Sequence, residues 1–490
     1  MKRLLAGILI LVQADTAIAQ DFEDAYRFSD MKLEGSARFT GMGGAFGAIG
    51  ADLTSIHINP AGMARYTKND FGITLGNNSW RTDATFKGTG TSDVRNNFAM
   101  PSLGLVFTGP TDEKSASLWK SAQFGVTFNR TNNFNQNSYI NGIHENSLSY
   151  YFAGQAAGTH PDELGIYHPF GAYLAYQTYV IDPTDSLGTS YTSQAVYGEG
   201  FEHQKTINRR GSMYETAISF SGNYDDKFYL GASLVFPGLR FEEMSAHREI
   251  MQDENLSLKE FTYFENLTIR GSGFGARIGA ILLPTDFLRL GLSYQTPFTY
   301  NMRDNWSASM KSEFDTTSWT MESLPGTYNY RLRTPGRVTA SAALVLNRRG
   351  MISVDYEFSD YSRAKFLRNN LDLNAYNFNQ ENQNITRFLR PVNNLRIGGE
   401  LRVTQELYLR GGFGLTTPGF SEDIVERYTP RYTYSGGVGY RNKDFYADLG
   451  YSLMQWFDDY YMYDPTLLPN AATAIDNKLT RIVGSVGVKF

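Results

Sequence analysis

Apolar and polar residues alternate with a period of two along much of this chain, the pattern of half-buried β-strands. Phe228, Leu230 and Leu234 share one face of such a segment, and Tyr229 and Ser233 share the other. We expect fourteen strands, near residues 69–80, 98–108, 120–130, 212–222, 227–242, 260–282, 287–300, 326–346, 351–361, 393–403, 406–416, 429–440, 444–456 and 479–490. Because a soluble β-sandwich shows the same alternation, this pattern alone does not distinguish a sandwich from a barrel.

The connections between these strands favour the barrel. From the third strand onward, short joins alternate with long polar ones. The short joins are 223–226, 283–286, 347–350, 404–405 and 441–443, and the long ones are 131–211, 243–259, 301–325, 362–392, 417–428 and 457–478. Outer-membrane barrels have this asymmetry, with tight periplasmic turns and long outer loops. We therefore expect a 14-stranded antiparallel transmembrane β-barrel, with Trp80, Trp119 and Trp456 at the membrane interfaces.

The last predicted strand ends on an aromatic residue. Val486, Val488 and Phe490 share its apolar face, while Ser485 and Lys489 lie on the opposite face. A terminal strand of this kind looks like the signal that the barrel-assembly machinery reads on outer-membrane proteins. It predicts a bacterial outer-membrane location, with contacts to that machinery and to outer-membrane lipid.

The opposite end of the chain reads as an export signal. Lys2 and Arg3 precede an apolar run, and a small-x-small pattern ends at Ala19, so we interpret residues 1–19 as a secretory signal peptide. Residues 20–68 do not alternate like strands and are rich in small residues, which suits a segment that plugs a barrel. The predicted organisation is a signal peptide at 1–19, a hatch at 20–68 and a barrel at 69–490.

Composition narrows the functional classes. The 490 residues carry a net charge of -5 spread along the chain, which argues against a nucleic-acid binder. The chain has no cysteine, so disulfides, thiolate metal sites and cysteine nucleophiles are excluded. No HExxH, P-loop or G-x-S-x-G motif occurs, and we expect neither an enzyme nor a cofactor.

Histidines raise the question of metal or haem capture. Five of the six fall in two predicted outer loops: His144, His160, His168, His203 and His247. Their spacing matches no compact ligand motif, and surface histidines are common. We expect no metal site on this evidence.

The predicted hatch contains the sequence GMGGAFGAIGADLTSIHINPAGMA, from Gly41 to Ala64. Asn59-Pro60-Ala61-Gly62 within it is a turn signal, and part of 44–56 could form a short helix. The Ala/Gly stretch, the Asp and the Asn-Pro-Ala-Gly together resemble the plug of the long-chain fatty acid transporter (FadL/TodX-like) outer-membrane family. Thr334–Val338 and Met351–Ser362 are similar to a strand pair of the same family.

This resemblance implies a plugged barrel that admits hydrophobic small molecules, such as fatty acids or aromatic compounds, and releases them sideways through its wall. The best candidates for gating are hatch residues, although each could equally serve only to hold the plug: Gly43, Gly44, Asp52, Asn59, Pro60 and Ala61.

The alternative is a barrel that binds a protein partner through its outer loops and serves secretion, surface attachment or envelope assembly. The loop at 131–211 contains aromatic clusters such as Tyr150-Tyr151-Phe152. Loops of this length are usually functional. It could be a landing groove for a ligand or partner, or a folded cap that stabilises the barrel.

Overall fold

The computed structural model describes residues 21–32, 34–110, 117–196, 200–346, 349–369, 376–421, 429–463 and 468–490. The predicted signal peptide at 1–19 lies outside the described residues. Within these ranges, no helix is long and apolar enough to cross a bilayer.

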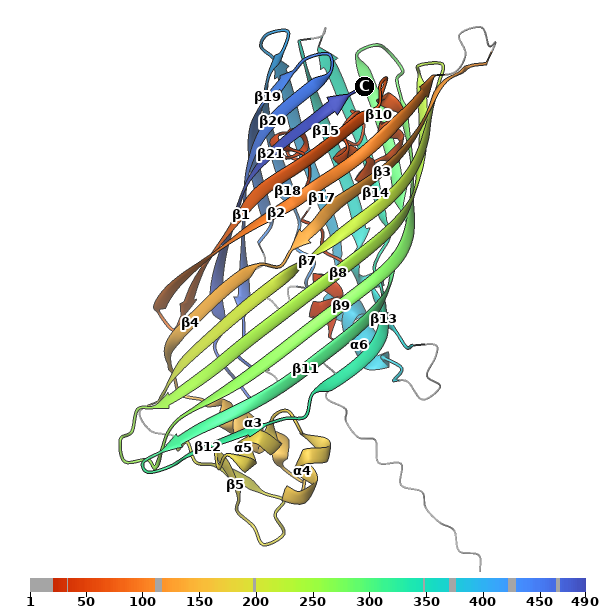
Figure 1. Cartoon of the computed structure of the whole chain (residues 1–490). Helices are drawn as coiled ribbons and strands as arrows, with labels where there is room; N and C mark the ends of the chain where they lie inside the picture. The colour runs from red at the N-terminus through yellow and green to blue at the C-terminus, as the bar shows by residue number, and fades with distance from the viewer. Residues whose placement is uncertain are drawn as a thin grey trace, which may run out of the picture.

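One antiparallel sheet closes on itself to form a barrel (Figure 1). Its strands are β1 (Asp70–Phe86), β2 (Thr89–Pro110), β3 (Trp119–Asn133), β4 (Gln136–His144), β7 (Phe201–Tyr224), β8 (Phe228–Met251), β9 (Leu258–Leu282), β10 (Leu288–Gln295), β11 (Thr299–Phe314), β12 (Ser318–Glu322), β13 (Gly326–Arg333), β14 (Arg337–Leu346), β15 (Gly350–Asp360), β16 (Lys365–Leu367), β17 (Pro391–Arg402), β18 (Leu407–Thr416), β19 (Arg431–Arg441), β20 (Phe445–Tyr460) and β21 (Thr473–Lys489). The first and last strands pair from Asp70–Lys489 to Thr85–Ala474 and close the ring.

In several places, two labelled strands that follow each other in sequence form one longer strand of the barrel. β3 and β4 both pair with β7, and β10 and β11 both pair with β9. β14 and β13 follow on the other side of β10 and β11. Counted in this way the barrel has fourteen strands, and the predicted fold class is confirmed.

The strands alternate between lipid and lumen as predicted. On β8, Leu230, Leu234 and Phe236 are exposed on the outer face, whereas Tyr229 and Ser233 are buried. Beyond Phe236 charged residues appear at outward positions, namely Arg240, Glu242 and Arg248, interspersed with uncharged ones such as Met244. Charged residues are unfavourable against lipid, so this change marks the outer edge of the membrane band on β8.

Two of the three tryptophans expected at the interfaces lie elsewhere. Trp119 is exposed at the start of β3, but Trp80 and Trp456 are buried, with their ring centroids 5.3 Å apart. The Lys32 Nζ lies 5.3 Å from the Trp80 ring and 5.5 Å from the Trp456 ring. The prediction that these two form part of an interfacial girdle is therefore wrong, because both occupy inward positions of their strands.

The described residues before β1, 21–32 and 34–69, are folded inside the barrel (Figure 1). They form α1 (Phe22–Arg27), α2 (Ala37–Gly41), η1 (Thr54–His57) and η2 (Pro60–Arg65), joined by turns. The helix considered for 44–56 is limited to η1 at its end, since Gly43, Gly44 and Gly50 have positive φ angles that interrupt a helix. We keep the name hatch for residues 20–68.

The described residues of the segment 131–211, which are 131–196 and 200–211, are structured. The ends of the segment belong to β3, β4 and β7, and its middle forms a cap of residues 145–196 at the end of the barrel opposite Phe490 (Figure 1). The cap contains α3 (Leu148–Ala156), α4 (Pro161–Tyr167), α5 (Ala172–Gln177) and the small sheet of β5 (Ile181–Pro183) and β6 (Tyr191–Ser193). Elsewhere, η3 (Tyr361–Arg363) and α6 (Asn379–Phe388) lie between β15 and β17.

Candidate functional site

The hatch packs against the wall where two strands carry glycine. Gly231 on β8 and Gly279 on β9 are paired partners. A Cβ added at Gly279 would lie 2.0 Å from the Asn59 Oδ1, and one added at Gly231 would lie 2.3 Å from the Pro60 carbonyl carbon. Only glycine allows the hatch backbone to approach this closely. The Asn-Pro-Ala motif of the sequence is therefore a docking point between hatch and wall.

Both polar atoms of the Asn59 side chain form hydrogen bonds at this docking point. Its Nδ2 donates to the carbonyl oxygens of Gly47, at 2.8 Å, and Ala280, at 3.1 Å. Its Oδ1 accepts from the Ala61 N–H at 3.1 Å, which caps η2. Asn59 and Ala61 are buried, and Pro60 occupies the first turn of η2. Asn59 thus joins two parts of the hatch to β9.

Gly43 and Gly44 have φ angles of 62° and 78°, a region that favours glycine. A Cβ at Gly43 would lie 3.1 Å from the backbone nitrogen of Phe413 on β18. The Asp52 carboxylate accepts from the Ser36 hydroxyl, at 2.7 Å, and from the Thr54 N–H, at 3.0 Å, both within the hatch. The structure brings Asn59, Pro60 and Ala61 together, while Gly43–Gly44 and Asp52 lie at separate points of the hatch.

Buried ion pairs tie the hatch to distant strands, and sequence reasoning did not identify them. Arg38 makes two 2.8 Å hydrogen bonds to the Glu400 carboxylate on β17. Both oxygens of the Asp30 carboxylate accept from the Arg431 guanidinium on β19, at 2.8 and 2.9 Å. A buried charge is stable only when it is paired, so each contact fixes the hatch relative to one strand.

Further hydrogen bonds connect the hatch to other strands of the barrel. The His57 ring lies 3.1 Å from the Glu215 carboxylate on β7 and 3.0 Å from the Thr127 hydroxyl on β3. The Asp355 carboxylate on β15 accepts from the backbone N–H groups of Phe46 and Gly47, both at 2.9 Å. The hatch is therefore held from nearly every side of the barrel.

The wall pairing is interrupted beside the hatch. β2 and β3 pair from Pro110–Ser121 only as far as Ser102–Asn129, and no further backbone pairing joins them among the described residues. From Asn129 to Asn133 every residue of β3 is buried, so the strand has turned inward. We call this interruption, between residues 96–101 and 130–135, the β2–β3 break.

The hatch covers the inner side of the break. The Lys32 N–H donates to the Thr131 carbonyl at 3.0 Å, and the Glu34 N–H donates to the Arg130 carbonyl at 3.2 Å. Across the break, the Arg130 guanidinium donates to the Asn97 side-chain oxygen at 3.1 Å. Side chains, and not a backbone ladder, therefore span this part of the wall.

A cavity of about 90 Å³, partly open to solvent, lies between the hatch and the barrel wall. Apolar side chains of Met31, Phe39 and Leu415 line it together with many polar ones. Its cationic lining residues are Lys32, Arg277, Arg337, Arg396, Arg431 and Arg481, and their carboxylate partners are Asp30, Glu34, Glu215 and Glu357. The six cations outnumber these four salt-bridged carboxylates. Lys32 also borders the β2–β3 break.

A closed fourteen-stranded barrel with an apolar outer band and a bore filled by its own amino-terminal segment defines an outer-membrane transport barrel. The chain belongs to the outer membrane protein transport protein family (OMPP1/FadL/TodX), whose model matches residues 34–464. The predicted resemblance and the outer-membrane location are confirmed. The family is one of transport channels for hydrophobic compounds, which agrees with the broad class predicted from the sequence.

Solved structures with the same fold include a Pseudomonas aeruginosa FadL homologue (TM-score 0.56, 12% identity, 94% of this chain and 99% of that chain covered). They also include the P. putida toluene transporter TodX (0.54, 14%, 94% and 99%) and the Ralstonia pickettii toluene transporter TbuX (0.51, 14%, 94% and 99%). At these identities the likeness concerns the fold alone. A comparison with curated proteins found no significant match.

Proposed function

We propose that this protein lets hydrophobic small molecules enter from outside, pass the hatch and leave sideways through the β2–β3 break. The observation that carries the proposal is the loss of strand pairing beyond Ser102–Asn129, directly beside a cavity lined by the hatch. A closed wall would force a greasy molecule through a watered bore, which is unfavourable. An exit through the wall delivers it to lipid.

The outer surface at the break suits such an exit. Phe98 on β2 is 70% exposed on the outer face, and Leu75 on the neighbouring β1 is 44% exposed. These residues belong to the apolar face of the wall, which contacts lipid in an outer-membrane barrel. A molecule leaving between β2 and β3 would therefore meet hydrocarbon.

The charge of the cavity indicates the chemical class of the cargo. All six cationic side chains of the lining are ion-paired, but they share only four salt-bridged carboxylates, and this excess of cations favours a molecule with an anionic head group. Met31, Phe39 and Leu415 in the same lining offer contacts for a hydrocarbon body. We therefore favour long-chain fatty acids over neutral aromatic compounds as cargo.

The lateral route is tested by closing the break. The chain has no cysteine, so Asn97→Cys and Arg130→Cys can be joined specifically by a short bismaleimide. Transfer of a fluorescent long-chain fatty acid into the membrane of proteoliposomes should fall at least tenfold after cross-linking. The unlinked double variant controls for the loss of the Arg130 side chain.

A second pair controls for cross-linking itself. Leu105 and Val126 are already paired on β2 and β3, so linking Leu105→Cys to Val126→Cys should leave transfer unchanged. Equal transfer by the linked and unlinked Asn97–Arg130 variants would contradict the lateral route. For the cargo class, Lys32→Met should lower transfer of the acid more than that of its neutral methyl ester. The control substitution Lys478→Met, at a half-exposed lysine on β21 outside the cavity lining, should affect neither.

A further inference from the structure

The outer end of the barrel contains a cluster of two histidines and a glutamate. His203 lies on β7, and His247 and Glu249 lie on the neighbouring β8, where His203 pairs with Glu249. All three point inward, beneath the cap, and are at most 1% exposed. They lie beyond the charged outward positions Arg240 and Glu242, so the cluster is outside the membrane band.

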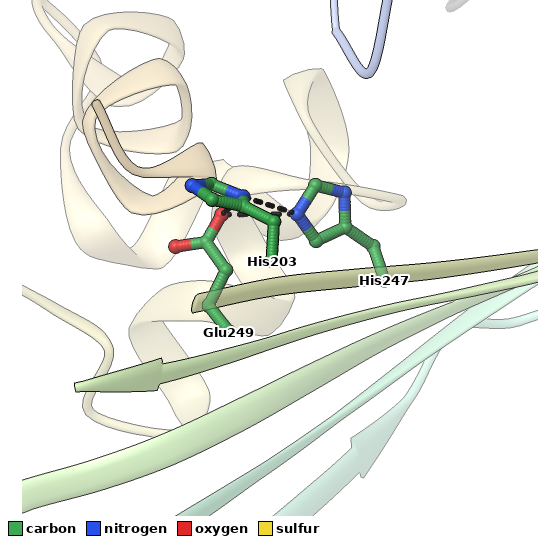
Figure 2. A group of neighbouring side chains, drawn as sticks. All are labelled: His203, His247 and Glu249. Atoms are coloured by element: carbon green, nitrogen blue, oxygen red, sulfur yellow. Dashed lines mark hydrogen bonds and ion pairs between the residues drawn. The ribbon is translucent and has the colours of Figure 1, made fainter. Parts of the chain in front are cut away.

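Three atoms of this cluster converge (Figure 2). The His203 Nδ1 lies 3.1 Å from the His247 Nε2 and 3.3 Å from the Glu249 Oε1. The His247 Nε2 lies 3.1 Å from the same Glu249 oxygen. The three atoms therefore form a nearly equilateral triangle.

With the Glu249 carboxylate ionised, protons on the two histidines cannot satisfy all three contacts of this triangle. If neither facing nitrogen carries a proton, two lone pairs face each other. If one carries a proton, the other lone pair faces the carboxylate oxygen, and if both do, two N–H groups face each other. Every arrangement leaves at least one contact between groups of the same kind, and a buried polar contact of that sort is unfavourable.

A divalent cation removes this conflict. It would bind both imidazole lone pairs and the carboxylate oxygen at once. With bonds of about 2.0–2.1 Å, the ligand atoms of a tetrahedral zinc site lie about 3.3 Å apart, close to the separations observed here. Two histidines and one glutamate form a donor set that zinc uses in proteins.

The surroundings hold the glutamate in place. Its Oε1 accepts from the Leu148 N–H at 2.7 Å, and its Oε2 accepts from the Ser147 hydroxyl. Ser147 is the N-cap of α3, the first helix of the cap. The cationic Lys205 nearby is directed to Ser245, at 3.1 Å, and to Glu265, at 3.4 Å. Hydrogen-bond donors such as Leu148 and Ser147, which contact a carboxylate ligand from outside, orient the ligands at metal sites.

We propose, against the expectation drawn from histidine spacing, that His203, His247 and Glu249 bind a divalent transition-metal ion, with zinc the best fit, and that the ion fastens the cap to β7 and β8. The site differs from the cavity proposed for cargo, and it would serve the structure of the cap. The ion would be bound by residues of β7 and β8, and its ligand Glu249 also accepts hydrogen bonds from Ser147 and Leu148 at the start of α3, so the site links all three elements.

The test measures metal content and cap stability in the full-length protein purified in detergent. After treatment with a chelator and incubation with ZnCl₂, we expect about one zinc per chain by elemental analysis. The bound ion should slow proteolysis within the cap severalfold. Cobalt should give the visible absorption of a four-coordinate site.

His203→Gln and His247→Gln should each abolish zinc binding, with the barrel still folded as judged by its heat-modifiable migration. His144→Gln is the matched control, because the His144 ring centroid lies 6.0 Å from that of His203 while its Nδ1 accepts the Asn146 N–H. No zinc on the wild-type protein at saturating concentration would overturn the proposal. So would equal zinc content in the wild type and both variants.

Discussion

Substituting one wall glycine should release the hatch without disturbing the barrel. In Gly279→Ala, the new Cβ would stand 2.0 Å from the Asn59 Oδ1 and 2.9 Å from its Cγ. An ordinary contact is about 3.5 Å, so the amide must move by roughly 1.5 Å. That displacement breaks the three hydrogen bonds that Asn59 makes to Gly47, Ala280 and Ala61.

The expected magnitude follows from these bonds. Each contributes about 0.5–1.5 kcal/mol net, so the docked hatch loses roughly 2–4 kcal/mol. Since about 1.4 kcal/mol corresponds to a factor of ten, the undocked population should rise roughly 30- to 700-fold. The assay is the swelling of proteoliposomes in small sugars, which reports an open bore.

Gly484→Ala is the matched control, because a Cβ there meets nothing within 4 Å. Its swelling rate should equal that of the wild type, whereas that of Gly279→Ala should be clearly higher. The steric clash requires the Asn59 side chain. In an Asn59→Ala background, Gly279→Ala should therefore raise the swelling rate little further. Identical swelling by the two folded glycine variants would refute the docking argument.

Further predictions address the hatch and the end of the chain. Arg38→Ala leaves the buried Glu400 with Arg410 as its remaining ion-pair partner and should destabilise the hatch by roughly 2–3 kcal/mol in urea unfolding, whereas the exposed Arg81→Ala should cost under about 1 kcal/mol; equal losses of stability in the two variants would contradict this ranking. Asn59→Ala should slow uptake of a hydrophobic probe without lowering the yield of folded barrel, and normal uptake would argue against a gating role. Phe490→Ser should lower the amount of protein assembled in the outer membrane severalfold, measured by heat-modifiable migration. Unchanged assembly would show that Phe490 does not contribute to the assembly signal.

The number of strands could be predicted from the alternation together with the family resemblance, but the outer ends of the strands could not. β1 continues to Phe86 and β7 begins at Phe201, well beyond the predicted limits near 80 and 212. Outside the lipid band, both faces of a strand contact water or polar side chains, so apolar alternation is lost. At the outer end of β1, for example, the outward Arg81 is followed by the inward Thr82.

The contacts between the hatch and the wall, and those within the histidine cluster, join residues that are far apart in sequence. A local sequence pattern could not predict them. The Asn-Pro-Ala motif was recognised, but its docking point on Gly231 and Gly279 lies far away in sequence. His203 and His247 could be assigned only to separate loops, because the pairing of β7 with β8 sets their distance. The usable signal was His247-x-Glu249, since residues two apart on a strand share a face.

The closing seam of the barrel constrains the order of its assembly. The Ala37 N–H donates to the Ser485 hydroxyl of β21, and the Arg481 guanidinium donates to the Lys32 carbonyl. The partners in these contacts are separated by more than four hundred residues, so the portion exported first must wait for the portion exported last. Such a high contact order predicts slow, concerted maturation, in which ring closure and burial of the leading portion are completed in the same step.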